Sequence, residues 1–147
     1  MRLFHYALLP YLPELQFKGQ LREIVLVMHQ WRVAGKTNHL LINKVMEYDK
    51  SHLTTYFMKY CYWYGQRYHK PASAKYALEF QDFCPEIIGF IDPPVFDGWH
   101  TKEYLRSNMA NLWEKHTMGV GKSRISDEEW QRLCEGYKTI TGEDYVI

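Results

Sequence analysis

The sequence predicts an all-α protein, folded as a single compact helical domain over residues 1–147. Three observations favour this fold class. Apolar residues recur at three- and four-residue steps in several separate segments, which is the spacing of amphipathic helices. The chain has a typical single-domain length, and aromatic residues make up 16% of it, far too many for a disordered chain. The least regular stretch, residues 70–98, is divided by prolines and glycines and offers no pair of strands.

Two prolines determine where the first long helix can start. Pro10 and Pro13 lack a backbone N–H and are tolerated in a first turn but not in a helix interior, so the helix should begin near residues 12–14. Its buried face is predicted from the apolar residues that follow: Phe17, Leu21, Ile24, Met28 and Trp31. The other face is polar and carries Lys18, Arg22 and His29, with Gln16, Gln20, Glu23 and Gln30 beside it.

Gly19 is unusual in the interior of this helix, because glycine there costs about 1 kcal/mol relative to alanine. Helical side chains lean toward the N-terminus, so Glu23 is directed at the space that a side chain on residue 19 would fill. The glycine would leave room above the carboxylate for another chain segment or a ligand. Close approach of a neighbouring helix at Gly19 is the alternative explanation.

Residues 1–9 are apolar and aromatic, so we expect them to pack against the body of the protein. The prolines that follow, and the lack of a small-residue cleavage site, argue against a secretory signal peptide. A terminal amine has a pKa near 7.7–8.0, against about 10.4 for lysine, so roughly a tenth of it is neutral at pH 7. An α-amine beside a carboxylate is a candidate Schiff-base nucleophile with its own proton acceptor. Met1 and Glu23 are therefore the candidate catalytic residues.

Two further helices are predicted after a loop at residues 32–38, in which Gly35 is the stop signal. One runs through residues 40–46, and the next runs from a cap at Ser51 toward Tyr68. The inward residues of the latter are predicted to be Leu53, Phe57, Tyr60, Cys61 and Tyr64. Its aromatic end, YCYWYGQRYH, could clamp nucleic acid, although simple packing explains it as well.

Five segments follow in the second half of the chain. Residues 76–83 form a brief helix, and IIGFIDPPVFDGW is an apolar loop or, alternatively, a strand without a partner. His100, for which we expect a structural role, precedes a helix at 101–115 whose inward residues are Tyr104, Leu105, Met109, Leu112 and Trp113. After a basic connector at 117–125, Ser126 and Glu129 form a capping box. The helix they start faces the body through Trp130, Leu133 and Cys134, and Gly136 should end it.

Basic residues in loops and near helix ends are candidate contacts to nucleic-acid phosphates. They are Arg32, Lys36, His39, Lys122 and Arg124. A solvated loop charge is the alternative for Lys36, and helix capping or packing is the alternative for His39. For Lys122 and Arg124 the alternative is a flexible basic connector that makes no contact with DNA. The GVGKS stretch is not a phosphate loop, because the spacing of that motif fails and a helix precedes it.

Composition limits the class of protein further. Three widely spaced cysteines predict free thiols in a reducing cytoplasm rather than a disulfide framework. No apolar run approaches the length of a membrane span, and no cluster has metal-ligand spacing, so we expect neither a membrane partner nor a metal. The formal charge of +1 gives weak support for DNA binding, since strong binders carry a clear basic excess.

Four stretches together resemble the pyrimidine-dimer DNA glycosylase family: MRLFHYALLPYLP, GQLRE, GKTNHLLINKV and LTTYFMKYC. The resemblance is densest over residues 1–70 and becomes loose from about residue 71 to 116, which completes the family-like core. Residues 117–147, the basic connector and C-terminal helix, correspond to a longer bacterial and phage branch.

The resemblance implies an all-helical domain whose N-terminal segment packs between helices. It implies a DNA repair glycosylase with abasic-site lyase activity that needs no cofactor. The N-terminal amine attacks the deoxyribose C1′, the damaged base leaves, an imine forms, and a helix glutamate helps drive β-elimination. Here these groups are Met1 and Glu23, and Arg2 and Arg22 match arginines that the family uses on DNA. The implied partner is damaged double-stranded DNA, and we expect a cytoplasmic monomer in a bacterial or phage-infected cell.

The chain departs from the family pattern at several positions. The well-studied members lose their initiator methionine, whereas the bulky Arg2 should cause Met1 to be retained here. Gln16 and Leu26 stand where a histidine and an arginine are expected. These changes favour abasic-site activity over specificity for pyrimidine dimers. Two alternatives are a non-catalytic helical DNA- or protein-binding module, and a site redirected to another nucleic-acid substrate such as a modified phage base.

Overall fold

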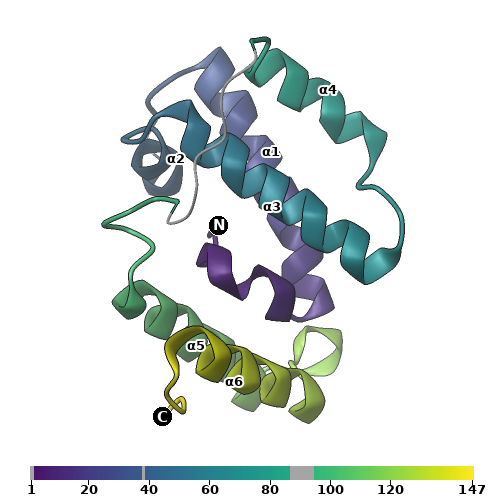
Figure 1. Ribbon diagram of the computed structural model, residues 1–147, viewed down its shortest axis with the longest axis vertical. Helices are drawn as coiled ribbons and strands as arrows, with labels where there is room; N and C mark the ends of the chain where they lie inside the picture. The colour runs from purple at the N-terminus through teal and green to yellow at the C-terminus, as the bar shows by residue number, and fades with distance from the viewer. Residues whose placement is uncertain (1, 38, 87–94) are drawn as a thin grey trace. The chain divides into compact units, whose positions relative to one another are not determined.

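The protein is described by a computed structural model over residues 2–37, 39–86 and 95–147. This part of the chain is all-α, as predicted, and contains no strand. Figure 1 traces its elements in order: the 3-10 helix η1 (Tyr6–Tyr11), α1 (Glu14–Val33), α2 (Leu40–Val45), α3 (Lys50–Tyr68), α4 (Ala74–Phe83), α5 (Lys102–Thr117), the 3-10 helix η2 (Gly121–Ser123) and α6 (Asp127–Thr141).

The elements belong to two compact units. The first comprises Met1–Leu3 and Gly19–Asp97, and the second comprises Phe4–Lys18 and Gly98–Ile147. The expectation of one domain over residues 1–147 stays a prediction. None of the described helices is both long and apolar enough to cross a membrane.

Helix α1 begins at Glu14, at the position that the prolines predicted. Four residues of its predicted stripe are buried: Phe17, Leu21, Ile24 and Met28. The fifth, Trp31, is half-buried and packs edge-on against Phe83, with 5.3 Å between ring centroids. The helix ends at Val33, and Gly35 follows with a positive φ of 64°. The stop signal in the sequence is thus confirmed.

The predicted cap of α3 is wrong by two residues. Asp49 is the N-cap, and its carboxylate accepts a hydrogen bond from the Ser51 backbone N–H at 3.0 Å. Aspartate and serine are both favoured caps, and here the carboxylate comes first and also gains from the positive helix N-terminus. The inward residues Leu53, Phe57 and Tyr60 are buried as predicted, whereas Cys61 and Tyr64 are half-buried.

The first unit is held together by contacts among α1, α3 and α4. Phe57 and Phe80 stack at 5.0 Å between centroids.

The expected apolar loop reaches residues 87–94, which lie outside the described residues, but Phe96 after them is fully buried. Its N–H donates to His52 Nδ1 at 2.9 Å, and the Tyr48 hydroxyl donates to the Asp97 carbonyl at 2.6 Å. Side chains of α3 and the turn before it thus fix the end of this segment.

In the second unit, residues 4–11 pack against α5 and α6. The His5 N–H donates to Asn108 Oδ1 at 2.7 Å, and the Tyr6 N–H donates to His100 Nδ1 at 3.1 Å. Arg132 on α6 donates to the Pro10 carbonyl at 2.9 Å. The expected packing of the N-terminal segment is therefore confirmed where the structure describes it. His100, 5% exposed, has the structural role that we expected.

The predicted end of α6 at Gly136 is wrong. The capping box of Ser126 and Glu129 starts the helix as predicted, but α6 continues to Thr141 and ends at Gly142 with a φ of 77°. Gly136 lies in the helix interior because Tyr11 packs directly on it. A Cβ at Gly136 would lie 2.4 Å from Tyr11 Cγ, so only glycine fits without displacing the ring.

Replacing Gly136 with alanine should destabilise the protein by about 1–2 kcal/mol. Overpacking costs about 1–3 kcal/mol, and the better helix propensity of alanine offsets up to about 1 kcal/mol of that cost. Gly65→Ala in α3 is the matched control. Apart from the nearby backbone of its own helix, no described atom lies within 4 Å of its Cβ position, so the gain in helix propensity should appear without an overpacking cost. Denaturant unfolding should therefore shift in opposite directions for the two variants. A stabilised Gly136→Ala protein would contradict the packing of Tyr11 on α6.

Candidate functional site

Glu23 lies on α1 in the first unit and is half-buried. Its Oε2 atom is buried, and no described residue hydrogen-bonds it. Burial raises the pKa of the Glu23 carboxyl above its ordinary value, while positive charges at the amino terminus, Arg22 and His39 act against that rise. A buried carboxylate oxygen without a hydrogen bond is costly for folding, which is typical of groups kept for a function.

The helix surface beside Glu23 is open at Gly19. Apart from its chain neighbours and the nearby backbone of α1 itself, no described atom lies within 4 Å of the position that a Cβ on Gly19 would take. In the described part of the chain, close approach of a neighbouring helix therefore does not explain this glycine. The open position leaves room on the helix surface next to the Glu23 carboxylate.

Replacing Gly19 with alanine should stabilise the protein but slow the reaction at Glu23. We expect Gly19→Ala to raise the free energy of unfolding by up to about 1 kcal/mol, because α1 gains helix propensity. It should also slow any reaction at Glu23 about tenfold or more, because the methyl group enters the free space that a substrate would use. Gly65→Ala, with the same expected gain in stability, should leave the rate unchanged. Equal rates for wild type and Gly19→Ala would contradict a role for this space.

The proposed nucleophile, Met1, lies outside the described residues, but the next residues are fixed. The Arg2 carbonyl accepts a hydrogen bond from Gln20 Nε2 on α1 at 2.9 Å. Leu3 is fully buried. Gln20 in turn accepts a hydrogen bond from the Tyr56 hydroxyl at 3.0 Å. The start of the chain is thus attached to α1 one turn before Glu23.

Sequence reasoning placed Gln20 beside the polar face and overlooked Tyr56. Gln20 is only 3% exposed and Tyr56 is fully buried. The spacing contained the signal, because Gln20 follows Phe17 by three residues and precedes Ile24 by four. A polar residue in register with a buried stripe indicates a buried hydrogen bond rather than a solvated side chain.

The predicted basic contacts in the first unit differ in their surroundings. Arg22, Lys36 and His39 are exposed. His39 is also the N-cap residue of α2, although its side chain makes no capping hydrogen bond. Arg32 instead pairs with Glu79 on α4, with 3.1 Å between Nη2 and Oε1. A phosphate at Arg32 would have to compete with that carboxylate.

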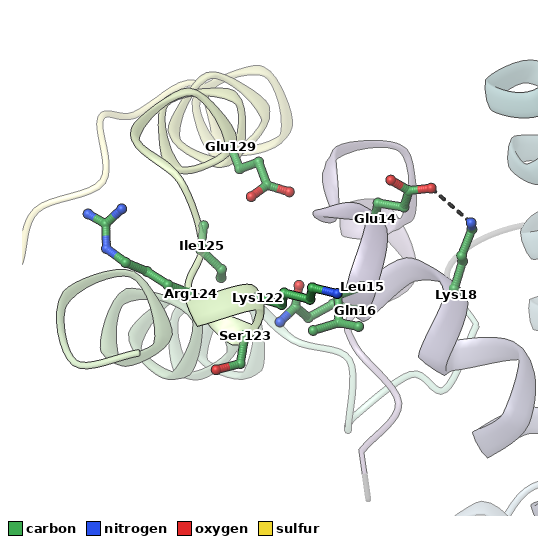
Figure 2. Close-up of a pocket in the computed structure, with 9 residues that line it drawn as sticks. All are labelled: Glu14, Leu15, Gln16, Lys18, Lys122, Ser123, Arg124, Ile125 and Glu129. Carbon is green, nitrogen blue, oxygen red and sulfur yellow. Dashed lines mark ion pairs between the residues drawn. The ribbon is translucent and has the colours of Figure 1, made fainter. Parts of the chain in front are cut away.

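Lys122 and Arg124 come together in the second unit, at a cavity of about 420 Å³ (Figure 2). Its lining residues come from α1 and from the connector and start of α6: Glu14, Leu15, Gln16, Lys18, Lys122, Ser123, Arg124, Ile125 and Glu129. Lys18 pairs with Glu14 at 2.8 Å, and Arg124 pairs with Asp127 at 3.4 Å. Gln16 Oε1 is buried, and no described residue hydrogen-bonds it. The cavity is therefore polar and of mixed charge.

Comparison of the chain with protein-family models, with curated proteins and with solved structures finds no match.

Proposed function

We propose that this protein is a DNA repair glycosylase with abasic-site lyase activity, in which the Met1 α-amine is the nucleophile and Glu23 the acid/base. The observation that supports this best is the half-buried carboxylate of Glu23, with one oxygen left without a hydrogen bond by the described residues. It lies beside the open surface at Gly19, and the chain at Arg2 is attached one helical turn away. An amine beside a carboxylate supplies the minimal groups for imine chemistry.

At an abasic site, the neutral amine attacks C1′ of the ring-opened sugar and water leaves, which gives an imine. Glu23 then accepts the C2′ proton as the C3′–O bond breaks, so that the strand is nicked and a phosphate-terminated end is released. Water hydrolyses the imine and returns the amine. On a damaged nucleotide, the amine first displaces the base as the N-glycosidic bond breaks. The raised pKa of Glu23 makes its carboxylate a stronger base for these proton transfers.

In duplex DNA, the damaged nucleotide would have to turn out of the helical stack before its C1′ atom could reach this amine. In the first unit, Arg2, Arg22, Lys36 and His39 are the proposed contacts to the DNA around it. In the second unit, Lys122 and Arg124 are proposed to contact phosphates. Figure 2 shows the Arg124 side chain extending away from the α1 residues of the cavity, so Lys122 is the stronger candidate for a phosphate there.

Borohydride trapping tests the proposal on a DNA duplex that contains one abasic site. Two proteins are compared: one with a native N-terminus at Met1, and one with Gly-Ser added before Met1. The native protein should form a covalent complex with DNA and nick the strand, and the extended protein should do neither. The extended protein controls for folding and DNA binding, because the addition alters no described residue.

A folded native protein that binds the duplex but forms no adduct would overturn the catalytic proposal. The result would then favour the second candidate, a non-catalytic helical DNA- or protein-binding module. The formal charge of +1, and the pairing of Arg32 with Glu79, are the observations that would fit a protein with modest affinity for DNA.

A further inference from the structure

Gln20 and Tyr56 form a buried hydrogen-bonded pair that reaches the start of the chain. Gln20 is 3% exposed in the middle of α1, and Tyr56 on α3 is fully buried. The Tyr56 hydroxyl donates to Gln20 Oε1 at 3.0 Å, and Gln20 Nε2 donates to the Arg2 carbonyl at 2.9 Å. Three segments of the first unit, namely residues 2–3, α1 and α3, are therefore joined through one side-chain amide.

The orientation of this amide is determined by its partners. A backbone carbonyl can only accept, so the NH₂ group of Gln20 must face Arg2. That leaves Oε1 for Tyr56, whose hydroxyl can donate to it. Turning the amide over would place two oxygen acceptors against each other inside the protein, where an unmade hydrogen bond costs about 1–3 kcal/mol. The Arg2 carbonyl is thus attached to one defined point on α1.

That point is close to Glu23. Residues three apart on a helix are neighbours on its surface, with about 5–6 Å between their Cβ atoms. Gln20 and Glu23 have this spacing, so the backbone at Arg2 is attached to the helix surface adjacent to the carboxylate. Only a few rotatable bonds separate the Arg2 carbonyl from the α-amine of the preceding residue. Burial of Leu3 holds the chain on the other side of the attachment.

We propose that Gln20 and Tyr56 are positioning residues: they fix the backbone at Arg2 on the surface of α1 next to Glu23, and the imine chemistry proposed for the N-terminal amine depends on that attachment. This inference rests on the proposed lyase function and deepens it. Neither side chain touches the substrate in this scheme. Their effect arises because a displacement of about 1 Å at a reacting group can cost about a hundredfold in rate.

The test compares Gln20→Leu and Tyr56→Phe with wild type on the abasic-site duplex. Single-turnover cleavage is measured at saturating protein, together with the dissociation constant for DNA and the melting temperature. Gln20→Leu removes the hydrogen bonds to Arg2 and Tyr56 with little change of volume, and we expect its cleavage rate to fall about a hundredfold. Tyr56→Phe removes only the hydroxyl, which leaves Gln20 bonded to Arg2 but takes away its hydrogen bond from Tyr56, so a drop of about tenfold is expected. DNA affinity should stay within about threefold of wild type for both variants.

Matched controls come from the same helices. Gln30→Leu on α1 and Tyr62→Phe on α3 make the same chemical changes at positions away from this pair, and Tyr62 is 58% exposed. Both controls should cleave at the wild-type rate. All rates are taken at a temperature at which every variant is fully folded, so a purely structural role for Gln20 would lower the melting temperature and leave the saturated rate unchanged.

The outcomes separate the two proposals. If Gln20→Leu cleaves the duplex at the wild-type rate at saturating protein, the positioning role is overturned and the lyase function stands. A weaker DNA affinity with an unchanged saturated rate would likewise overturn it, because the residues would then act on binding alone. A wild-type protein that neither traps nor cleaves the duplex would overturn the lyase function, and this assignment with it.

Discussion

Replacing Glu23 with glutamine is expected to lower the rate of abasic-strand cleavage by ~10²–10⁴-fold, the usual contribution of a positioned acid or base. Glutamine has nearly the same shape as glutamate but cannot accept the C2′ proton. Formation of the imine requires the amine rather than a strong base, so borohydride should still trap some covalent complex with the variant. Single-turnover cleavage and trapping, measured on the same duplex, check these two expectations separately.

The same substitution should not destabilise the protein. Burial raises the pKa of the Glu23 carboxyl, so the folded state binds a proton more readily than the unfolded state does. Stability is therefore lost as pH rises through the window above the ordinary pKa of glutamate, and a neutral amide avoids that loss. We expect the melting temperature of Glu23→Gln at pH 7 to equal or exceed that of wild type. Glu114→Gln changes an exposed residue on α5 in the same way and should cleave at the wild-type rate. If Glu23→Gln also cleaves at the wild-type rate, Glu23 is not the acid/base.

Mild acid should destabilise the protein through two buried histidines. Burial lowers the pKa of His5 from 6.5 to about 4, although a hydrogen bond to the His100 backbone acts against that shift. Burial, together with the nearby charge of His5, lowers the pKa of His100 from 6.5 to about 2. The unfolded state therefore binds more protons below pH 6.5, and stability falls as pH decreases from 6.5 toward about 4 for His5 and about 2 for His100. At roughly 1.36 kcal/mol per pKa unit, each histidine removes on the order of 3 kcal/mol by pH 4.

His100→Asn tests this acid sensitivity. Its side-chain oxygen can accept the Tyr6 N–H in place of His100 Nδ1, and it carries no titrating proton. The variant should lose some stability at pH 7, because the stack of His100 on Tyr104 is removed. Between pH 6.5 and 4.5, however, its free energy of unfolding should fall about half as steeply as that of wild type. His69→Asn, at an exposed left-handed C-cap where asparagine is also favoured, should keep the wild-type slope. A wild-type free energy that stays constant over this range would contradict the burial of neutral His5 and His100.

Much of this fold could be predicted from local signals. Pro10 and Pro13 set the start of α1, and the Ser126 capping box set the start of α6, because each depends on a few neighbouring residues. The predictions from sequence were wrong where a contact with a residue far away in the chain determines the local structure. Gly136 is a helix-stop residue by propensity, yet Tyr11, far away in the sequence, makes it an interior packing position. Asp49 and Ser51 are both favoured caps, and propensity alone could not choose between them.

In the candidate site, too, local features could be predicted from the sequence, whereas contacts between distant segments could not. Gly19 and Glu23 could be paired from helix geometry, since their spacing alone places the carboxylate beside the glycine. The attachment of Arg2 to Gln20 could not be predicted, because it depends on how α3 brings Tyr56 to α1. The pairing of Arg32 with Glu79 was likewise hidden, since the carboxylate comes from α4.

Peptide mapping of the borohydride-trapped complex tests whether the α-amine of Met1 is the nucleophile. The trapped protein is digested with protease and nuclease, and tandem mass spectrometry locates the residual sugar. The added mass should lie on the α-amine of Met1, in the N-terminal peptide alone. Added mass on a lysine, such as Lys36, or a folded DNA-bound protein without any adduct, would contradict it.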